Sequence, residues 1–207
     1  MDGVSVVGVG VRFDDWLFRG IDLEVRPGEC AAVVGTNGTG KSTLLRCLSG
    51  EQPVTEGVVL VDGAPPDERA AAFRRAVSVL VDEPDDVGER TARQYADLLA
   101  GTHGIDRDPG ALLDAAGLAE RADVPVDALS AGQRRRLLLV GATARPHTVL
   151  LVDEPERALD AAGRRWAAEL LTAARSRAAV VLTSHDRTLA DAVADRVLEL
   201  PDPAQTL

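Results

Sequence analysis

A glycine-rich stretch, GTNGTGKST at residues 35–43, limits the folds open to this chain more than any other part of it. It fits the phosphate-binding pattern GxxxxGK[ST], the P-loop. The apolar run at 30–34 predicts a short buried strand before it, and the run at 43–48 has helical spacing. Glycines let the backbone curl so that successive N–H groups face phosphate oxygens, and a helix N-terminus adds partial positive charge. The stretch therefore predicts a nucleotide site formed by Gly35, Thr36, Asn37, Gly38, Thr39, Gly40, Lys41, Ser42 and Thr43.

Two side chains of this stretch have specific roles in the pattern. Lys41, the only lysine in the sequence, is expected to reach the β- and γ-phosphates. The Ser42 hydroxyl is expected to bind Mg²⁺. The predicted ligands are therefore a nucleoside triphosphate and a magnesium ion.

The rest of the chain alternates predicted strands with predicted helices. Strands are expected at 4–12, 20–25, 57–61, 76–81, 148–152, 178–183 and 196–200, and helices at 43–48, 67–75, 91–100, 109–118, 134–140, 163–174 and before 194. Several strands are apolar throughout, which is typical of a parallel sheet covered on both faces. The fold class is therefore α/β.

Polar residues follow the ends of four of these strands. Gly35, Asp82, Asp153 and His185 each lie just past a predicted strand, and ligands of such sheets bind at the carboxyl ends of strands. Two of these ends look alike, VLVDEP at 79–84 and LLVDEP at 150–155. A P-loop ATPase needs one aspartate to help hold Mg²⁺ and one glutamate to activate water. The local sequence does not decide which of the two ends serves.

Composition narrows the function classes. The net charge of −10 argues against non-specific nucleic-acid binding as the main activity, so no nucleic-acid partner is expected. Cys30 and Cys47 lack metal-ligand spacing and are expected to be small buried hydrophobes in a reducing compartment. No apolar run is long enough to span a membrane and no signal peptide precedes the first strand, so we expect a soluble cytoplasmic protein.

Two further groups of residues allow alternatives. Aromatic rings at Phe13, Trp16 and Phe18 could stack on a nucleotide base, but for Trp16 and Phe18 packing at the edge of a small sheet is favoured. The arginines at 134–136 follow Ser130, a good helix N-cap, and are interpreted as a solvated helix face.

The motifs occur in an order that resembles the nucleotide-binding domain of ABC (ATP-binding cassette) ATPases. The order is the P-loop, LSAGQ at 129–133, DEP at 153–155, ALD at 158–160 and a strand ending at His185, and the resemblance runs from residue 4 to residue 200. This resemblance implies that Asp153 and Glu154 lie at the end of the Walker B strand. It implies one domain, 1–207, with a P-loop NTPase core (31–85 and 146–200), a small antiparallel β subdomain (1–30 and 56–66) and an inserted helical subdomain (about 87–145).

The resemblance also assigns roles near the phosphates. It implies that Glu154 is the general base, that Asp153 joins Ser42 at Mg²⁺, and that His185 is the switch histidine near the γ-phosphate. Phe13 takes roughly the place of the adenine-stacking aromatic, although the turn after it is a residue short, and Trp16 is the fallback.

A second group of roles concerns the opposite subunit. Ser130, Gly132 and Gln133 resemble the signature loop, which in this family caps the ATP bound to the other subunit. Ala131 stands where the family usually has glycine, a change we expect to be tolerated. Asp160 corresponds to the D-loop aspartate.

Asp82 departs from the family pattern, which has glutamine at the Q-loop. A carboxylate binds Mg²⁺ more strongly than an amide, but it adds negative charge near the γ-phosphate and Asp82 reaches less far. The alternative is that Asp82 faces solvent. The departure leaves open the hydrolysis rate and the coupling to transport, but not ATP binding.

The resemblance implies the ATPase subunit of an ABC transporter. It would dimerise head-to-tail with a second copy or a paralogue around two MgATP and act through a separate transmembrane permease, so that it lies in the cytoplasm at the inner face of the membrane. The alternatives are an ABC-type ATPase working on nucleic acid or the ribosome, and a poorly hydrolysing regulatory cassette. The run LSAGQRRR at 129–136 is also similar to the ATPase of cytochrome c maturation exporters, which does not name a cargo.

Overall fold

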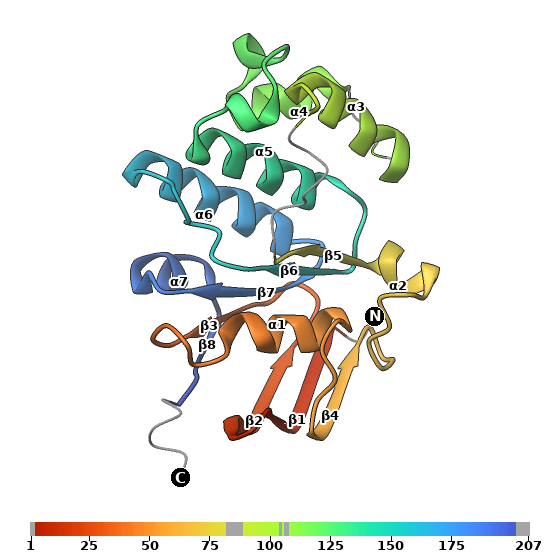
Figure 1. The fold of residues 1–207 in the computed structure, drawn as a ribbon, viewed down its shortest axis with the longest axis vertical. Coiled ribbons are helices and arrows are strands. Elements are labelled where there is room, and N and C mark those ends of the chain that lie inside the picture. The colour runs from red at the N-terminus through yellow and green to blue at the C-terminus, as the bar shows by residue number, and fades with distance from the viewer. Residues whose placement is uncertain (1–2, 82–88, 104, 106–107, 202–207) are drawn as a thin grey trace.

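The computed structural model describes residues 3–81, 89–103, 105 and 108–201 and contains two sheets and a set of helices (Figure 1). The strands are β1 (Val4–Arg12), β2 (Trp16–Val25), β3 (Cys30–Val34), β4 (Glu56–Val61), β5 (Val77–Leu80), β6 (Val149–Val152), β7 (Ala179–Ser184) and β8 (Arg196–Glu199). The helices are α1 (Lys41–Ser49), α2 (Ala71–Ala76), α3 (Ala92–His103), α4 (Pro109–Ala116), α5 (Ala131–Ala144), α6 (Ala161–Arg175) and α7 (Arg187–Val193). The α/β class is confirmed.

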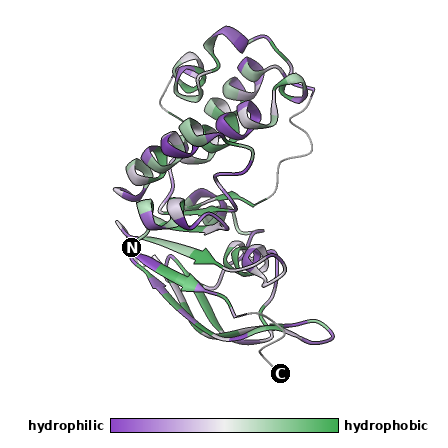
Figure 2. Ribbon diagram, turned by 90° about the vertical axis from the view of Figure 1, so that its left-hand side faces the viewer, coloured by the Kyte–Doolittle hydropathy of each residue, from purple (hydrophilic) through white to green (hydrophobic). Residues whose placement is uncertain are grey.

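The central sheet is parallel, with strand order β5-β6-β7-β3-β8. Every residue of β3, β6 and β7 is buried, as expected for apolar strands covered on both faces. These strands form the green centre of Figure 2, whereas the helices mix green and purple. The order places β7 between the P-loop strand β3 and the strand β6, so the ends of all three strands meet at one edge.

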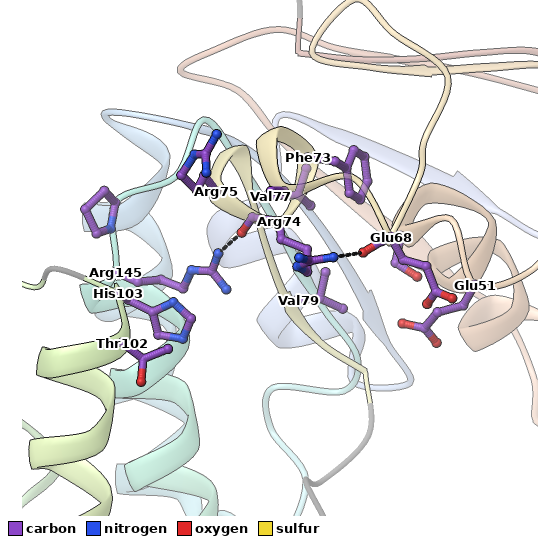
Figure 3. Close-up of a pocket in the computed structure, with 13 residues that line it drawn as sticks. Glu51, Glu68, Phe73, Arg74, Arg75, Val77, Val79, Thr102, His103 and Arg145 are labelled. Atoms are coloured by element: carbon purple, nitrogen blue, oxygen red, sulfur yellow. Dashed lines mark hydrogen bonds between the residues drawn. The ribbon is translucent and has the colours of Figure 1, made fainter.

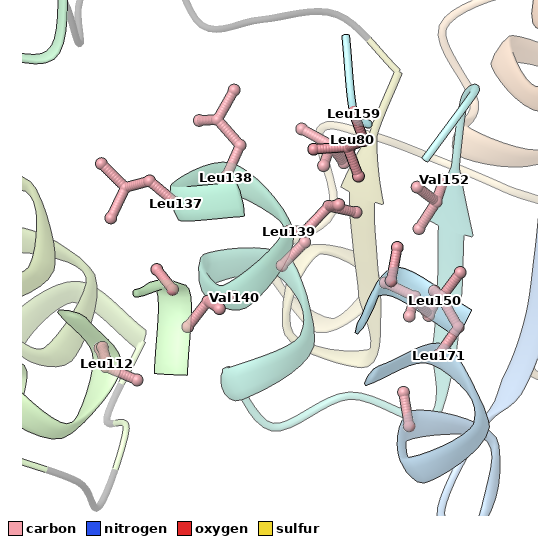
Figure 4. Packing of buried hydrophobic residues seen from close by; sticks show 14 of the residues in the cluster. Leu80, Leu112, Leu137, Leu138, Leu139, Val140, Leu150, Val152, Leu159 and Leu171 are labelled. Atoms are coloured by element: carbon pink, nitrogen blue, oxygen red, sulfur yellow. The ribbon is translucent and has the colours of Figure 1, made fainter. Parts of the chain in front are cut away.

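Alternate strand residues feed two hydrophobic clusters, one on each face of the sheet. On one face, Leu150 and Val152 of β6 pack with Leu139 of α5 and Leu171 of α6 (Figure 4). On the other face, Leu151 joins a cluster that includes α1 and the antiparallel strands. Figure 1 shows the same layering, with α5 and α6 on the opposite side of the sheet from α1.

The second sheet is antiparallel, with order β2-β1-β4, and packs against the α1 face of the core. Its second strand begins at Trp16, earlier than the predicted 20, because the turn before it takes only residues 13–15. Phe18 is fully buried and Trp16 is half-buried, so the interpretation of these rings as packing residues is confirmed.

The helices α3, α4 and α5 lie between β5 and β6 in chain order and pack against one another. The boundaries predicted for the subdomains stay a prediction. Cys30 and Cys47 are free and 1% exposed, and burial raises the pKa of each thiol to about 12. The prediction that they are buried is therefore confirmed.

Candidate functional site

The glycine-rich loop joins β3 to α1 in a backbone shape that glycine alone adopts easily. Gly38 and Gly40 have φ angles of 86° and 93°, in the left-handed region. A Cβ on Gly40 would lie 2.7 Å from Cδ1 of the buried Phe18, so a side chain has no room there. Helix α1 begins directly after Gly40, at Lys41. The loop therefore has the left-handed glycines that the pattern predicts, and a helix N-terminus follows it directly.

Lys41 is buried, and its ammonium group is held inside the loop. Its Nζ donates to the carbonyl oxygens of Gly35 and Thr36, each at 3.0 Å. The Thr39 hydroxyl also donates to Thr36 O, at 3.0 Å. The positive charge of Lys41 is thus fixed at the loop, where a phosphate group would bind.

Asp153 brings three elements together just past the end of β6. The Ser42 hydroxyl of α1 donates to its Oδ2 at 2.7 Å, and the Thr183 hydroxyl of β7 donates to its Oδ1. A carboxylate and a hydroxyl are oxygen donors of the kind that Mg²⁺ prefers, so Ser42 and Asp153 fit this ion. Asp82, the third predicted magnesium ligand, lies outside the described residues. The sequence did not identify Thr183 as a partner of Asp153, although Thr183 lies only two residues before the predicted His185.

Glu154 is held through its backbone in the left-handed region, with φ 43°. Its N–H donates to Thr183, to the carbonyl at 3.2 Å and to the hydroxyl at 3.0 Å. Its side chain is 30% exposed, so water can reach the carboxylate. The strained backbone is maintained by its partners and fixes where this carboxylate lies.

Arg135 is buried, with 3% of its surface exposed, although the sequence predicts a solvated helix face at 134–136. That prediction is wrong for Arg135. Its Nη2 donates to the carbonyl oxygens of Asp153 and of Glu154, the latter at 3.0 Å. Helix α5 is covered on nearly all sides, so a charged residue in it can point inward. Arg135 therefore ties α5 to the two Walker B residues. Arg136 differs, because its guanidinium lies over the ring of Trp166, 5.2 Å from the centroid.

His185 follows the last residue of β7 and lies between two carboxylates. Its Nδ1 is 3.6 Å from Oε1 of Glu154 and 3.4 Å from Oε1 of Glu156. The structure therefore brings together the predicted Glu154 and His185. Glu156 was not predicted, since a glutamate in a loop is usually exposed.

The residues predicted to form the signature loop lie at the N-terminus of α5. Ser130 caps the helix and forms a capping box with Gln133, with Gln133 N to Ser130 Oγ at 3.2 Å and Ser130 N to Gln133 Oε1 at 3.1 Å. A Cβ on Gly132 would lie 2.8 Å from Ala158 O, so this loop packs against the turn 158–160. Asp160 is the N-cap of α6 and accepts from Gly163 N at 2.7 Å. Both helix starts leave Ser130 and Asp160 exposed.

The two aromatic candidates for base stacking have different surroundings. Phe13 is 63% exposed in the turn before β2. Trp16 has the guanidinium of Arg19 4.6 Å from its ring centroid. Because Arg19 already covers a face of Trp16, the exposed Phe13 is the better candidate.

Comparison with known proteins identifies the family. A family model described as "ABC transporter" matches residues 18–157. The chain belongs to the ABC transporter ATP-binding subunits. It is 42% identical to a hemin import ATP-binding protein of Streptomyces coelicolor, over 86% of this chain and 67% of that protein. It is 37% identical to a cytochrome c biogenesis ATP-binding export protein of Pseudomonas aeruginosa, over 85% of this chain and 89% of that protein.

Solved structures agree on the fold. A dimeric bacterial ABC transporter cassette superposes with a TM-score of 0.79 at 22% identity, over 95% of this ABC chain and 94% of that one. A cassette bound to ADP and Pi gives a TM-score of 0.82 at 22% identity, over 97% and 95%. The P-loop NTPase fold expected from the sequence is therefore confirmed. Relatives named for import and for export match about equally well, so what they share is the ATP-binding cassette and not a cargo.

Proposed function

We propose that this ABC subunit hydrolyses ATP to drive transport through a separate membrane subunit. The observation that carries the proposal is the meeting of four groups at the carboxyl edge of the parallel sheet. These are the loop with its buried ammonium, the pair Ser42 and Asp153, the strained Glu154, and His185. Relatives named as ATP-binding proteins of hemin import, sulfonate import and cytochrome c biogenesis export favour this reading over an ATPase working on nucleic acid.

Each group of residues has its own role in ATP hydrolysis. The loop N–H groups and Lys41 bind the phosphates and face the charge that develops on the transferred phosphoryl group. Ser42 and Asp153 would hold Mg²⁺, which supplies further charge neutralisation when bound. Glu154 accepts the proton of the water whose oxygen attacks the γ-phosphorus, and ADP leaves. His185 lies 3.6 Å from Glu154 and would contact the γ-phosphate. Phe13 would stack on the adenine.

A second nucleotide-binding subunit would complete the site. Ser130, Gly132 and Gln133 lie at the N-terminus of a 14-residue helix, where the helix dipole and a hydroxyl favour an anion. Ser130 is exposed, and its hydroxyl caps its own helix. We propose that these residues and Asp160 face the ATP of a second copy or a paralogue in a head-to-tail dimer.

The permease would bind at a cavity of about 710 Å³ beside α2 (Figure 3). Its lining comes from the end of α1 and the residues after it, from α2 and the residues before it, from β5, from the end of α3 and from the segment after α5. It includes Glu51, Phe73, Arg75, His103 and Arg145. Apolar and charged side chains of both signs line it, which suits an amphipathic segment of a partner. Docking there would hold the subunit peripherally at the inner face of the membrane. In the described part of the chain, none of the helices combines the length and the apolar character needed to cross a bilayer.

The central test replaces Glu154 by glutamine. A general base contributes roughly 10²–10⁴ in rate, so Glu154→Gln is expected to bind ATP normally and to lose nearly all turnover. It should also form an ATP-dependent dimer that light scattering detects. The matched control is Glu169→Gln, the same change at an exposed position of α6. Wild-type-like hydrolysis by Glu154→Gln would sink the assignment. ATP binding without turnover by the unchanged chain would make it a regulatory cassette instead.

The permease proposal has its own test. Arg75→Glu reverses an exposed charge at the cavity, whereas Arg69→Glu makes the same change outside its lining. Co-expression with a multi-helix membrane protein encoded beside this chain should give a complex that Arg75→Glu weakens and Arg69→Glu does not. Equal effects of the two changes would place the partner elsewhere.

A further inference from the structure

Glu156 is a buried carboxylate that the proposed reaction does not use. It lies between β6 and α6, and its side chain is 2% exposed. Its Oε1 accepts from the Ser184 hydroxyl at 2.6 Å and from the His185 backbone N–H at 3.2 Å. Its Oε2 is buried without a hydrogen-bond partner among the described residues. An ionised carboxylate costs much free energy to bury, and an uncharged acceptor would satisfy the same hydroxyl and N–H.

The ring of His185 lies against the buried carboxylate of Glu156. The Nδ1 atom lies 3.4 Å from Glu156 Oε1 and 3.6 Å from Glu154 Oε1. A neutral imidazole carries one N–H, and the hydrogen-bond acceptor beside a ring nitrogen decides which nitrogen holds it. Two carboxylates near Nδ1 favour the proton on Nδ1. In that tautomer the Nε2 atom, on the opposite edge of the ring, carries no proton.

An N–H on Nδ1 has two carboxylates within 4 Å as possible acceptors, Glu154 and Glu156. Glu156 is closer, and it is buried where the local dielectric is low, whereas the side chain of Glu154 is 30% exposed. An N–H held by Glu156 leaves the oxygens of Glu154 available to accept a proton from water. Ser184 fixes the same Oε1 that faces the ring, so the acceptor does not move with the ring.

We propose that Glu156 is a positioning residue for hydrolysis. Its carboxylate accepts a hydrogen bond from Nδ1–H of His185, so that the ring does not donate this bond to the general base Glu154. The proposal rests on the proposed ATPase function for its kinetic consequence, but the pairing of Glu156 with His185 does not. In this proposal Glu156 affects hydrolysis through His185 and does not touch the nucleotide.

The first experiment measures the tautomer of His185 by NMR of ¹⁵N-labelled histidine. The sequence has three histidines, and His185→Ala assigns the signals. The unchanged protein should show a proton on Nδ1 of His185. Glu156→Gln keeps the size and an acceptor oxygen but removes the charge, so the tautomer with the proton on Nε2 should gain population. The same tautomer in both proteins, or a proton on Nε2 in the unchanged protein, would overturn the pairing.

The second experiment measures steady-state ATP hydrolysis in a double-mutant cycle. Partners that orient metal-ligating histidines change activity by about 10- to 100-fold, and we take the lower end for His185, so Glu156→Gln should lower kcat by about 10-fold with KM unchanged. In the His185→Ala background the same change should have no further effect. An equal fall in both backgrounds, or a fall matched by Glu169→Gln, would show a role that does not pass through His185. Absence of hydrolysis in the unchanged protein would remove the proposed function and leave the NMR experiment as the test of the pairing.

Discussion

Replacing Arg135 by methionine tests the link between α5 and the Walker B residues. Arg135 is 3% exposed and donates to the backbone carbonyls of Asp153 and Glu154. Hydrogen bonds from a charged group contribute about 1.5–3 kcal/mol each, so the two bonds amount to about 3–6 kcal/mol. Removing the guanidinium also removes the cost of burying its charge, which offsets part of the loss. We expect Arg135→Met to lower the free energy of unfolding by about 2–4 kcal/mol.

The measurement is urea and thermal unfolding followed by circular dichroism. For a chain of this size 1 kcal/mol shifts Tm by about 2–4 °C, so the midpoint should fall by about 5–15 °C. The control is Arg136→Met, which removes only a cation–π contact with Trp166 and should cost about 1 kcal/mol or less. Equal losses of unfolding free energy for Arg135→Met and Arg136→Met would refute the reasoning. The two buried hydrogen bonds of Arg135 would then contribute no more than the cation–π contact of Arg136.

Two further outcomes concern the loop and the half-buried His147. Gly40→Ala puts a Cβ 2.7 Å from Phe18 Cδ1 at φ 93° and should cost about 1–3 kcal/mol and weaken nucleotide binding, measured by urea unfolding and ATP titration. Gly28→Ala, at φ 92° with open space around the site, should cost only about 1 kcal/mol; equal costs would contradict the crowding argument. Burial lowers the pKa of His147 below 6.5, so its contribution to stability is complete above about pH 6.5 and is lost as pH falls through the lower folded pKa. The unfolding free energy should therefore fall less steeply on acidification in His147→Gln, and an unchanged slope would count against this origin.

The sequence predicted the parts of the site that a local pattern encodes. The glycines and Lys41 of the loop are specified by spacing, and the structure gives them the expected backbone shape. Ser130 was expected as a helix N-cap, and the structure shows it capping α5. The proximity of Ser42 and Asp153 also followed, because the carboxyl ends of parallel strands share one edge.

The sequence could not predict which arginine of 134–136 points inward. Consecutive residues of a helix lie about 100° apart, so three adjacent arginines face three directions. An apolar stripe would normally decide among them, but α5 is buried from 137 to 143, and no single face stands out. The choice of Arg135 depends on where β6 and its two carbonyl oxygens lie, which is a tertiary property.

Glu156 and the start of β2 were missed for a different reason. Burial of Glu156 becomes favourable only through Ser184 and His185, which are 28 and 29 residues away in the chain. The strand β2 begins at Trp16 because Arg12 pairs with it across the sheet, and pairing of this kind is not visible in one segment.

The position of Lys41 has a practical consequence for labelling. The sequence offers a single ε-amino group, and in the structure that group is buried and engaged with two loop carbonyls. Acylating reagents can thus modify one lysine side chain only, and only when the loop opens. The rate of that modification reports the opening of the nucleotide loop directly, without an introduced probe.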